Sequence, residues 1–139
     1  MNEGTDSLPD RMDAAVAAQQ IWRLYRQAGG ATFNLFYGNL AGRSLYAVSV
    51  YSDRTRDVNE TALDRNMVEA YIRANLDLLA LPENSIGLWL AADEGKVYLD
   101  VSITVADRQR ALYLARQHGE QAICHLSDMR DCIERSSRC

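Results

Sequence analysis

The segment SIGLWLAADEGKVYLDVSITVADRQRALYLARQHGEQAICHL, residues 85–126, carries the most regular pattern in the 139-residue chain. Apolar side chains at positions 97, 99, 101, 103 and 105 alternate with more polar ones, which is typical of a half-buried strand. The apolar run 86–92 predicts a second strand. Residues 93–95, Asp-Glu-Gly, predict a hairpin turn between the two because glycine accepts a positive φ.

The same segment continues into a helix and a further strand. Asp107 can cap the start of the helix, and Gly119 can end it in a left-handed conformation. Residues 121–126 predict a last short strand. The whole segment therefore predicts a β-β-α-β unit that buries one sheet face beneath a helix.

Upstream of this unit, the sequence predicts one helix and two strands. Ser7 and Pro9 fit the start of the helix, and Gly29 fits its end. Residues 32–37 and 45–51 show strand-like alternation, and the glycines between them favour a connection. We expect these two strands to form a second hairpin.

The remaining segments are a polar loop, a second helix and the two ends of the chain. Residues 52–60 are the most polar stretch and predict a loop. A helix capped by Thr61 is expected to run until just before Pro82. A short helix is expected over residues 127–134, and residues 1–6 and 135–139 are expected to be flexible.

These elements together predict an α+β fold. We expect residues 1–139 to form a single compact domain, with the order α-β-β-α-β-β-α-β, a largely antiparallel sheet packed by helices and a short C-terminal helix. The chain is long enough to bury one substantial core and too short for two full domains.

Composition and charge narrow the class of protein. Apolar residues make up 47% of the chain and charged residues 24%, which is typical of globular domains. No apolar run approaches the roughly 20 residues of a membrane helix, and the polar amino terminus does not resemble a secretory signal. We therefore expect no membrane association and a cytoplasmic location. The net charge of −4 disfavours direct nucleic-acid binding.

The sequence offers little for catalysis or metal binding. It has only two histidines, and no Gly-x-Ser-x-Gly or phosphate-binding glycine motif. His118, His125, Cys132 and Cys139 lie seven residues apart, whereas zinc sites usually contain close ligand pairs. Cys124 beside His125 could give an activated thiolate, although neighbours in a strand point to opposite faces. We expect no catalytic residue, no metal and no cofactor, and keep a small enzyme using these two residues as an alternative.

Several residues are candidates for a binding surface. Trp22 is either a rim residue of the core or an exposed anchor for a partner. Arg54 and Arg56 either hold phosphate or carboxylate groups or are neutralised by acidic residues of the same loop. The full set of candidates is Trp22, Tyr37, Tyr51, Arg54, Arg56, Asp93 and Glu94.

Asp100 stands out within its predicted strand because it lies between Leu99 and Val101. On a solvent-exposed face an aspartate is ordinary. On a covered face it needs a partner such as an arginine.

Residues 45–126 contain a series of short sequence motifs. They are YAVSVYSDR (46–54), NLDLL (75–79), Pro-x-Asn-Ser (82–85), Gly-x-Trp (87–89), K-x-Y-L-D-V-S (96–102) and an A-I-x-x-L ending (122–126). This set resembles a group of small uncharacterised proteins carried by bacteriophages, plasmids and other mobile elements. Those proteins tend to have an aromatic residue and Asp where this chain has Cys124 and His125.

The resemblance implies that the protein acts in a bacterial host cell, but it implies no particular reaction. A compact acidic domain carried by a mobile element is expected to bind a host protein or protein complex without catalysis. Its concrete form would be an inhibitor of a host defence complex, of the anti-CRISPR or anti-restriction type. A self-associating structural protein is a further alternative. It predicts a homodimer through an open sheet edge or through a face containing Phe36 and Tyr46.

Overall fold

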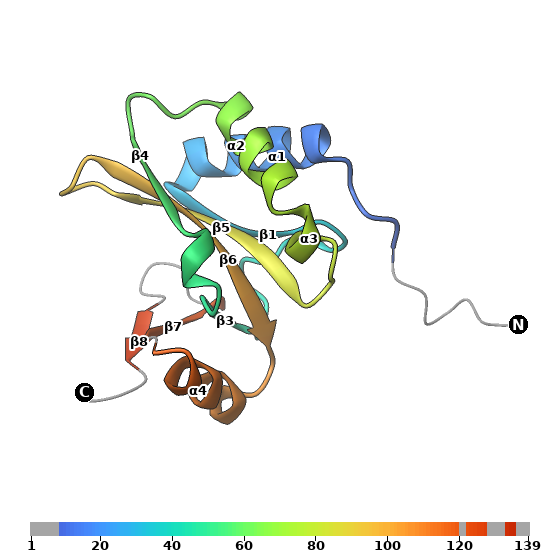
Figure 1. Cartoon of the computed structure of the whole chain (residues 1–139), viewed down its shortest axis with the longest axis vertical. Coiled ribbons are helices and arrows are strands. Elements are labelled where there is room, and N and C mark those ends of the chain that lie inside the picture. The colour runs from blue at the N-terminus through green and yellow to red at the C-terminus, as the bar shows by residue number, and fades with distance from the viewer. Residues whose placement is uncertain (1–8, 120–121, 128–132, 136–139) are drawn as a thin grey trace, which may run out of the picture.

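Strands β5 (Asn84–Ala91) and β6 (Lys96–Val105) form the centre of an antiparallel sheet in the computed structural model, which describes residues 9–119, 122–127 and 133–135. Their register runs from Asn84 opposite Ile103 to Ala91 opposite Lys96. Gly95 in the connecting turn has a φ of +67°, which glycine adopts without a steric penalty. The predicted hairpin is confirmed, and its tip extends beyond the helices (Figure 1).

The other strands add to both sides of this hairpin, in the order β2-β1-β5-β6-β3-β7-β8. On the far side of β6, β4 pairs with residues 96–99 and β3 pairs with residues 103–105 of the same strand edge. All pairings within the described residues are antiparallel. These strands are β1 (Gly30–Asn34), β2 (Gly38–Asn39), β3 (Tyr46–Val48), β4 (Arg56–Asn59), β7 (Ala122–His125) and β8 (Ile133–Arg135).

Helices cover the face of the sheet that receives the odd-numbered side chains of β6. The helices are α1 (Ala14–Ala28), α2 (Arg65–Ala74), α3 (Leu76–Leu79) and α4 (Arg108–Gln117). Val97, Leu99 and Val101 pack in the main core with α1 and α2, whereas Ile103 and Val105 pack in a smaller core with α4. Within the described residues, no helix combines the length and the apolar character needed to cross a bilayer.

The opposite face of the sheet is covered in part by the chain between β2 and β3. Leu40, Ala47 and Leu126 form a small buried cluster there. The Leu40 amide donates to the Thr32 carbonyl at 2.9 Å, and the Gly42 amide donates to the Leu126 carbonyl at 2.8 Å. These bonds hold the loop over the sheet. On the same face, Thr32, Ser85 and Ser102 of the central strands are buried.

The α+β fold class predicted from the sequence is confirmed, as are several element ends. The Asp107 carboxylate accepts hydrogen bonds from the amides of Gln109 and Arg110, and it therefore caps α4. Gly29, with a φ of +79°, ends α1, and Gly119, with a φ of +72°, follows α4. Left-handed glycines satisfy the last carbonyls of a helix at little steric cost.

The predicted second hairpin is wrong. Residues 32–37 and 45–51 do not pair with each other, because β1 pairs with β5 and β3 pairs with β6 and β7. The long β5–β6 hairpin offers one free edge on each side, and β1 and β3 take opposite edges. The predicted loop over 52–60 is also wrong in part. It contains the short helical turn η2 (Ser52–Arg54) and the edge strand β4, whose charged side chains remain in solvent.

Two predicted helix starts and the predicted C-terminal helix need correction. The N-cap of α1 is Asp13, which accepts from the Ala15 amide at 3.2 Å, and Ser7 lies outside the described residues. Asp64 rather than Thr61 caps α2, because Asp64 accepts from the Met67 amide at 2.9 Å.

At the C-terminal end, Ile133–Arg135 form β8, since they pair with β7, so no helix extends through this stretch. Arg135, which was expected to be flexible, belongs to that strand. The predicted flexible residues 1–6 and 136–139, and the part of the predicted helix over 128–132, lie outside the described residues.

Candidate functional site

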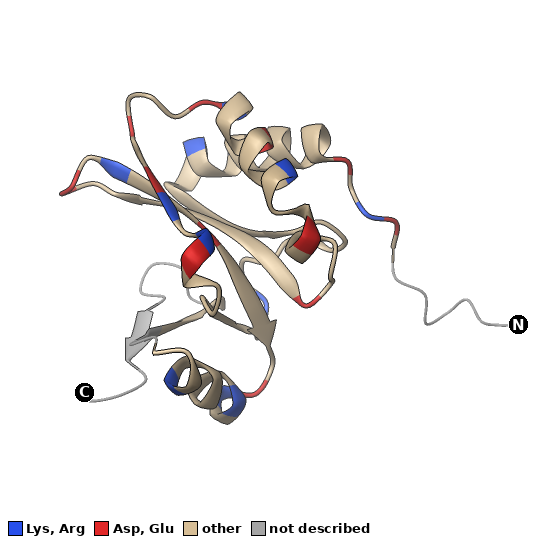
Figure 2. Cartoon of the chain, in the orientation of Figure 1, with Lys and Arg blue, Asp and Glu red and all other residues tan. Residues whose placement is uncertain are grey.

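The protruding end of the β5–β6 hairpin carries an exposed aromatic pair. Trp89 and Tyr98 are cross-strand partners, and their rings stack at 5.0 Å between centroids with 25° between planes. Trp89 is 43% exposed although it lies within a central strand. Asp93 and Glu94 are exposed at the tip, where Figure 2 shows acidic residues. We call these four residues, Trp89, Asp93, Glu94 and Tyr98, the hairpin surface.

Hydrogen bonds and ion pairs order this surface. The Tyr98 hydroxyl donates to Glu94 Oε1, and this bond is the main reason why the pKa of Tyr98 lies above its ordinary value. Lys96 Nζ lies 2.9 Å from Asp57 Oδ2, and the ammonium lowers the pKa of the Asp57 carboxyl. Because Lys96 is already paired with Asp57, the carboxylates of Asp93 and Glu94 set the sign of the charge at the tip.

Asp100 lies behind the aromatic pair, on the same face of the sheet. Its carboxylate accepts hydrogen bonds from Ser49 Oγ at 2.9 Å and from Ser102 Oγ at 3.5 Å, and it also bonds with the Trp89 side chain. The residue keeps some solvent exposure, but desolvation of its carboxylate outweighs these bonds and raises its pKa above the ordinary value of 3.8. Its partners are therefore hydroxyls and an indole rather than an arginine.

Gly87 makes room for this carboxylate. It is the cross-strand partner of Asp100, and a Cβ atom added to Gly87 would collide with Asp100 Oδ1. The bond to Trp89 links the enclosed carboxylate to the hairpin surface. Gly87 therefore leaves room for the carboxylate that Ser49 holds at 2.9 Å, beside the exposed indole of Trp89.

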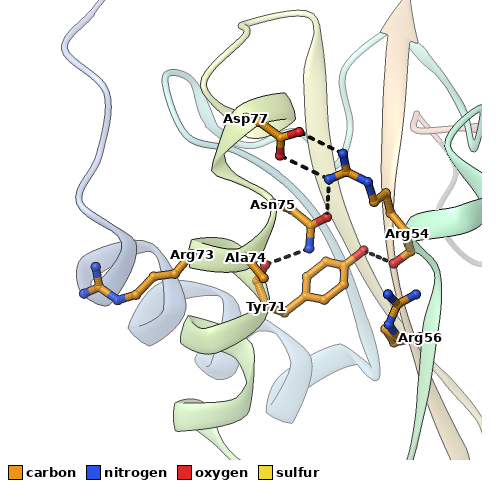
Figure 3. Close-up of a pocket in the computed structure, with 7 residues that line it drawn as sticks. All are labelled: Arg54, Arg56, Tyr71, Arg73, Ala74, Asn75 and Asp77. Atoms are coloured by element: carbon orange, nitrogen blue, oxygen red, sulfur yellow. Dashed lines mark hydrogen bonds and ion pairs between the residues drawn. The ribbon is translucent and has the colours of Figure 1, made fainter.

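The two candidate arginines line a pocket of about 540 Å³ beside α2 and α3 (Figure 3). Arg54 Nη2 donates to Asp77 Oδ2 at 2.8 Å, and Nη1 donates to Asp77 Oδ1 at 3.1 Å and to Asn75 Oδ1 at 2.8 Å. Asp53, in the same loop as Arg54, lies farther away, at 3.8 Å. Arg54 is thus neutralised mainly by a residue on α3. The remaining lining residues are Arg56, Tyr71, Arg73 and Ala74.

The three aromatic residues that the sequence predicted for a binding surface lie in different parts of the structure. Trp22 is half-buried against the main core and stacks on Tyr25, with the Arg26 guanidinium 5.7 Å from the Trp22 ring centroid. Tyr37 is 44% exposed in the turn after β1. Tyr51 is half-buried, and its hydroxyl donates to Asn84 Oδ1 at 3.1 Å. None of the three lies on the hairpin surface.

Cys124 and His125 face opposite sides of the sheet, as adjacent strand residues do. Cys124 packs with the cluster of Leu40 and Ala47, whereas the His125 ring stacks on Tyr46 at 4.4 Å. The two side chains therefore do not form a thiolate–imidazole pair. Over residues 9–119, 122–127 and 133–135, no group of three or more His, Cys, Asp or Glu side chains is placed to hold a metal ion.

Sequence reasoning placed Trp89 in a strand but did not identify it as an exposed contact residue. The reason is that residues 86–92 are apolar or glycine at every position, so the alternation that separates a buried face from an exposed one is not visible. The alternation of polar and apolar residues along β6 was the sequence signal that could have placed Trp89 on the exposed face. Tyr98 and Asp100 share a face there, and Trp89 lies opposite Tyr98.

Comparisons with protein-family models, curated proteins and solved structures gave no match to this chain.

Proposed function

We propose that the chain is a non-enzymatic protein-binding module that contacts a partner protein through the hairpin surface. The observation that carries this proposal is the exposure of Trp89 on a protruding hairpin. An exposed indole leaves apolar area in water, and burying it is worth about 25 cal/mol per Å². Tryptophan and tyrosine are enriched among the residues that dominate protein interfaces.

The chemistry of the hairpin surface indicates what kind of partner fits. Asp93 and Glu94 at the tip favour a partner surface with basic side chains, because complementary charge speeds association and excludes wrong partners. The faces of Trp89 and Tyr98 can also receive a guanidinium or ammonium group. The expected partner therefore presents arginine or lysine beside an apolar patch.

The resemblance to proteins of mobile elements supports a finer form of the proposal. In this form the partner is a component of a host defence complex, of the CRISPR or restriction type, in the bacterial cytoplasm. The module would inhibit that complex by occupying one of its surfaces.

Binding by purified components tests the general proposal. The chain is used to isolate its partner from a bacterial host, and the affinity is then measured by calorimetry with both proteins purified. Trp89→Ala is expected to weaken binding by tenfold or more, about 1.4 kcal/mol. The matched control is Tyr113→Ala, which removes an aromatic side chain that is 52% exposed on α4.

Because Trp89 also bonds to Asp100, a second variant separates binding from folding. Asp93→Lys changes only one exposed side chain of the turn, keeps the bond between Tyr98 and Glu94, and is expected to slow association. Equal affinity for wild type, Trp89→Ala and the charge-reversed variant would contradict the proposal. A plaque assay with hosts that carry or lack one defence system tests the finer form for that system. The chain is expected to raise phage plating only in the host that carries the system. Unchanged plating in that host would contradict the finer form for that system.

A further inference from the structure

The arginine pocket of Figure 3 is separate from the hairpin surface. It is formed where η2 and β4 meet the end of α2 and the start of α3, on the side of the sheet that the helices cover. Three arginines and a single carboxylate line it, although the chain as a whole carries a net charge of −4. The pocket is therefore a local concentration of positive charge.

Arg54 contributes to the pocket mainly as a support. Its guanidinium is held by Asp77 and Asn75, and its backbone carbonyl accepts a hydrogen bond from the Tyr71 hydroxyl at 2.8 Å. The Asn75 amide in turn donates to the Tyr71 carbonyl at 2.9 Å. These bonds fix one wall of the pocket and leave Arg54 few donors for a ligand.

Arg56 is held differently. Its Nη1 donates to the backbone carbonyls of Asp53 at 3.0 Å and Thr55 at 2.8 Å. In the part of the chain that the structure describes, it forms no ion pair with a carboxylate. Two neutral acceptors therefore orient the Arg56 guanidinium without neutralising its charge, and its Nε and Nη2 remain as donors on one edge.

Arg73 lines the opposite side and extends away from Arg56 in Figure 3. Its Nε and Nη2 both donate to Glu69 Oε2, and Glu69 is shared with Arg65. Since one carboxylate serves two arginines, this trio also leaves positive charge near the pocket. Arg73 thus adds to the potential without being the group that would touch a ligand.

We propose that this pocket binds an oxyanion, a phosphate or carboxylate group, through the Nε and Nη2 edge of Arg56. A guanidinium edge with two parallel donors matches two oxygens of such a group. Arginine suits this task better than lysine because its fork is planar and permanently charged. Tyr71 and Ala74 form the wall beside the bound group.

Titration of the full chain by NMR tests the proposal. Amide and arginine Nε–Hε signals are followed during addition of sodium phosphate and, separately, of sodium glutarate, with sodium chloride at equal ionic strength as the reference. We expect saturable shifts centred on Arg56 with at least one of the two oxyanions. The tighter of the two identifies whether a phosphoryl or a carboxylate group is preferred.

Variants locate the binding. Arg56→Gln is expected to weaken the oxyanion affinity by tenfold or more, Arg56→Lys to weaken it less, and Arg110→Gln, at an exposed arginine of α4, to leave it unchanged. Thermal unfolding of each variant checks that the fold is retained, and Arg56→Lys preserves the charge if Arg56→Gln unfolds. Shifts that do not saturate, that match those of chloride or that survive both substitutions at Arg56 overturn the proposal, whatever the hairpin surface binds.

Discussion

Asp100 and Gly87 show how two residues of the central hairpin depend on each other. The carboxylate folds over the backbone of Gly87, where a side chain would collide with it, and Ser49 and Ser102 donate to it. Burial raises its pKa, so the ionised form is held in the folded protein at a cost. The hydroxyl bonds reduce this cost without removing it.

Replacing Asp100 by Asn should change how stability depends on pH. The pKa of Asp100 is raised on folding, so between its ordinary value of 3.8 and the folded value the native state binds more protons than the unfolded chain. Its contribution to stability is therefore largest below pH 3.8 and falls as pH rises through this window. The stability of wild type relative to Asp100→Asn should therefore fall as the pH rises above 3.8.

Urea unfolding of both proteins across this range measures the difference. The subtraction removes the opposite contributions of Asp57, Glu69 and Asp77, whose pKa values are lowered by basic partners. Asp93→Asn, at the exposed tip, gives the baseline for losing a surface carboxylate. A difference between wild type and Asp100→Asn that rises with pH would show that the carboxylate is stabilised in its charged form.

Replacing Gly87 by Ala should destabilise the protein through overpacking. The added methyl group meets Asp100 Oδ1 in a buried site, and such insertions cost about 1–3 kcal/mol. The cost should shrink or reverse when Asp100→Ala is present, because the shorter side chain leaves room for the methyl group. Chemical denaturation of the four proteins of this cycle measures the coupling, and additive effects would exclude the collision as the cause.

The first turn of α2 gives a prediction about an element boundary. The Asp64 carboxylate accepts from the Met67 amide, whereas the Thr61 hydroxyl bonds locally with Asn59. Asp64→Ala should therefore lose about 1 kcal/mol of stability, and Thr61→Ala should lose much less. Thermal unfolding compares the two variants, and a larger loss for Thr61→Ala would move the N-cap back to the residue that the sequence pattern favoured.

The central elements could be predicted from the sequence because their signals are local. The alternation along β6, the glycine at position 95 and the cap at Asp107 each act within a few residues. The partners of β1 and β3 could not, because both had strand patterns that fit pairing with each other. Which edge each strand takes is decided by the two open sides of the β5–β6 hairpin and by the loop that crosses the sheet behind Leu40.

The candidate sites were only partly predictable for the same reason. The acidic tip and the two arginines were visible as exposed polar groups. The acid that neutralises Arg54, however, is Asp77 on α3 and not a neighbour in its own loop. The Ser49 contact to Asp100 joins residues 51 positions apart. Contacts of such separation depend on the completed sheet and leave no mark in a local pattern.

The two cores on the helical face imply uneven stability across the molecule. The main core contains the large buried side chains Phe33, Ile72 and Leu88, whereas the core around α4 is built from Val48, Leu112, Ile123 and two alanines. Regions with fewer buried apolar contacts open at lower free energy. Amides of α4 should therefore exchange with deuterium at least tenfold faster than those of β5 and β6, with α1 as the helical control. Equal protection of α1 and α4 would indicate one cooperative unit.

The edge of β6 that pairs with both β4 and β3 has a consequence for variation of this fold. The chain leaves that edge after Val48 and returns to it at Arg56, so the intervening residues 49–55 form a detour whose two ends are anchored to one strand. Val50 packs against the core around α4 and Tyr51 packs against the main core, so variation that keeps both cores is confined to residues 52–55 of this excursion. Arg54 lies within this excursion and Arg56 directly follows it, and both line the arginine pocket. New sequences at this position would therefore change which ligands the pocket binds and leave the architecture intact.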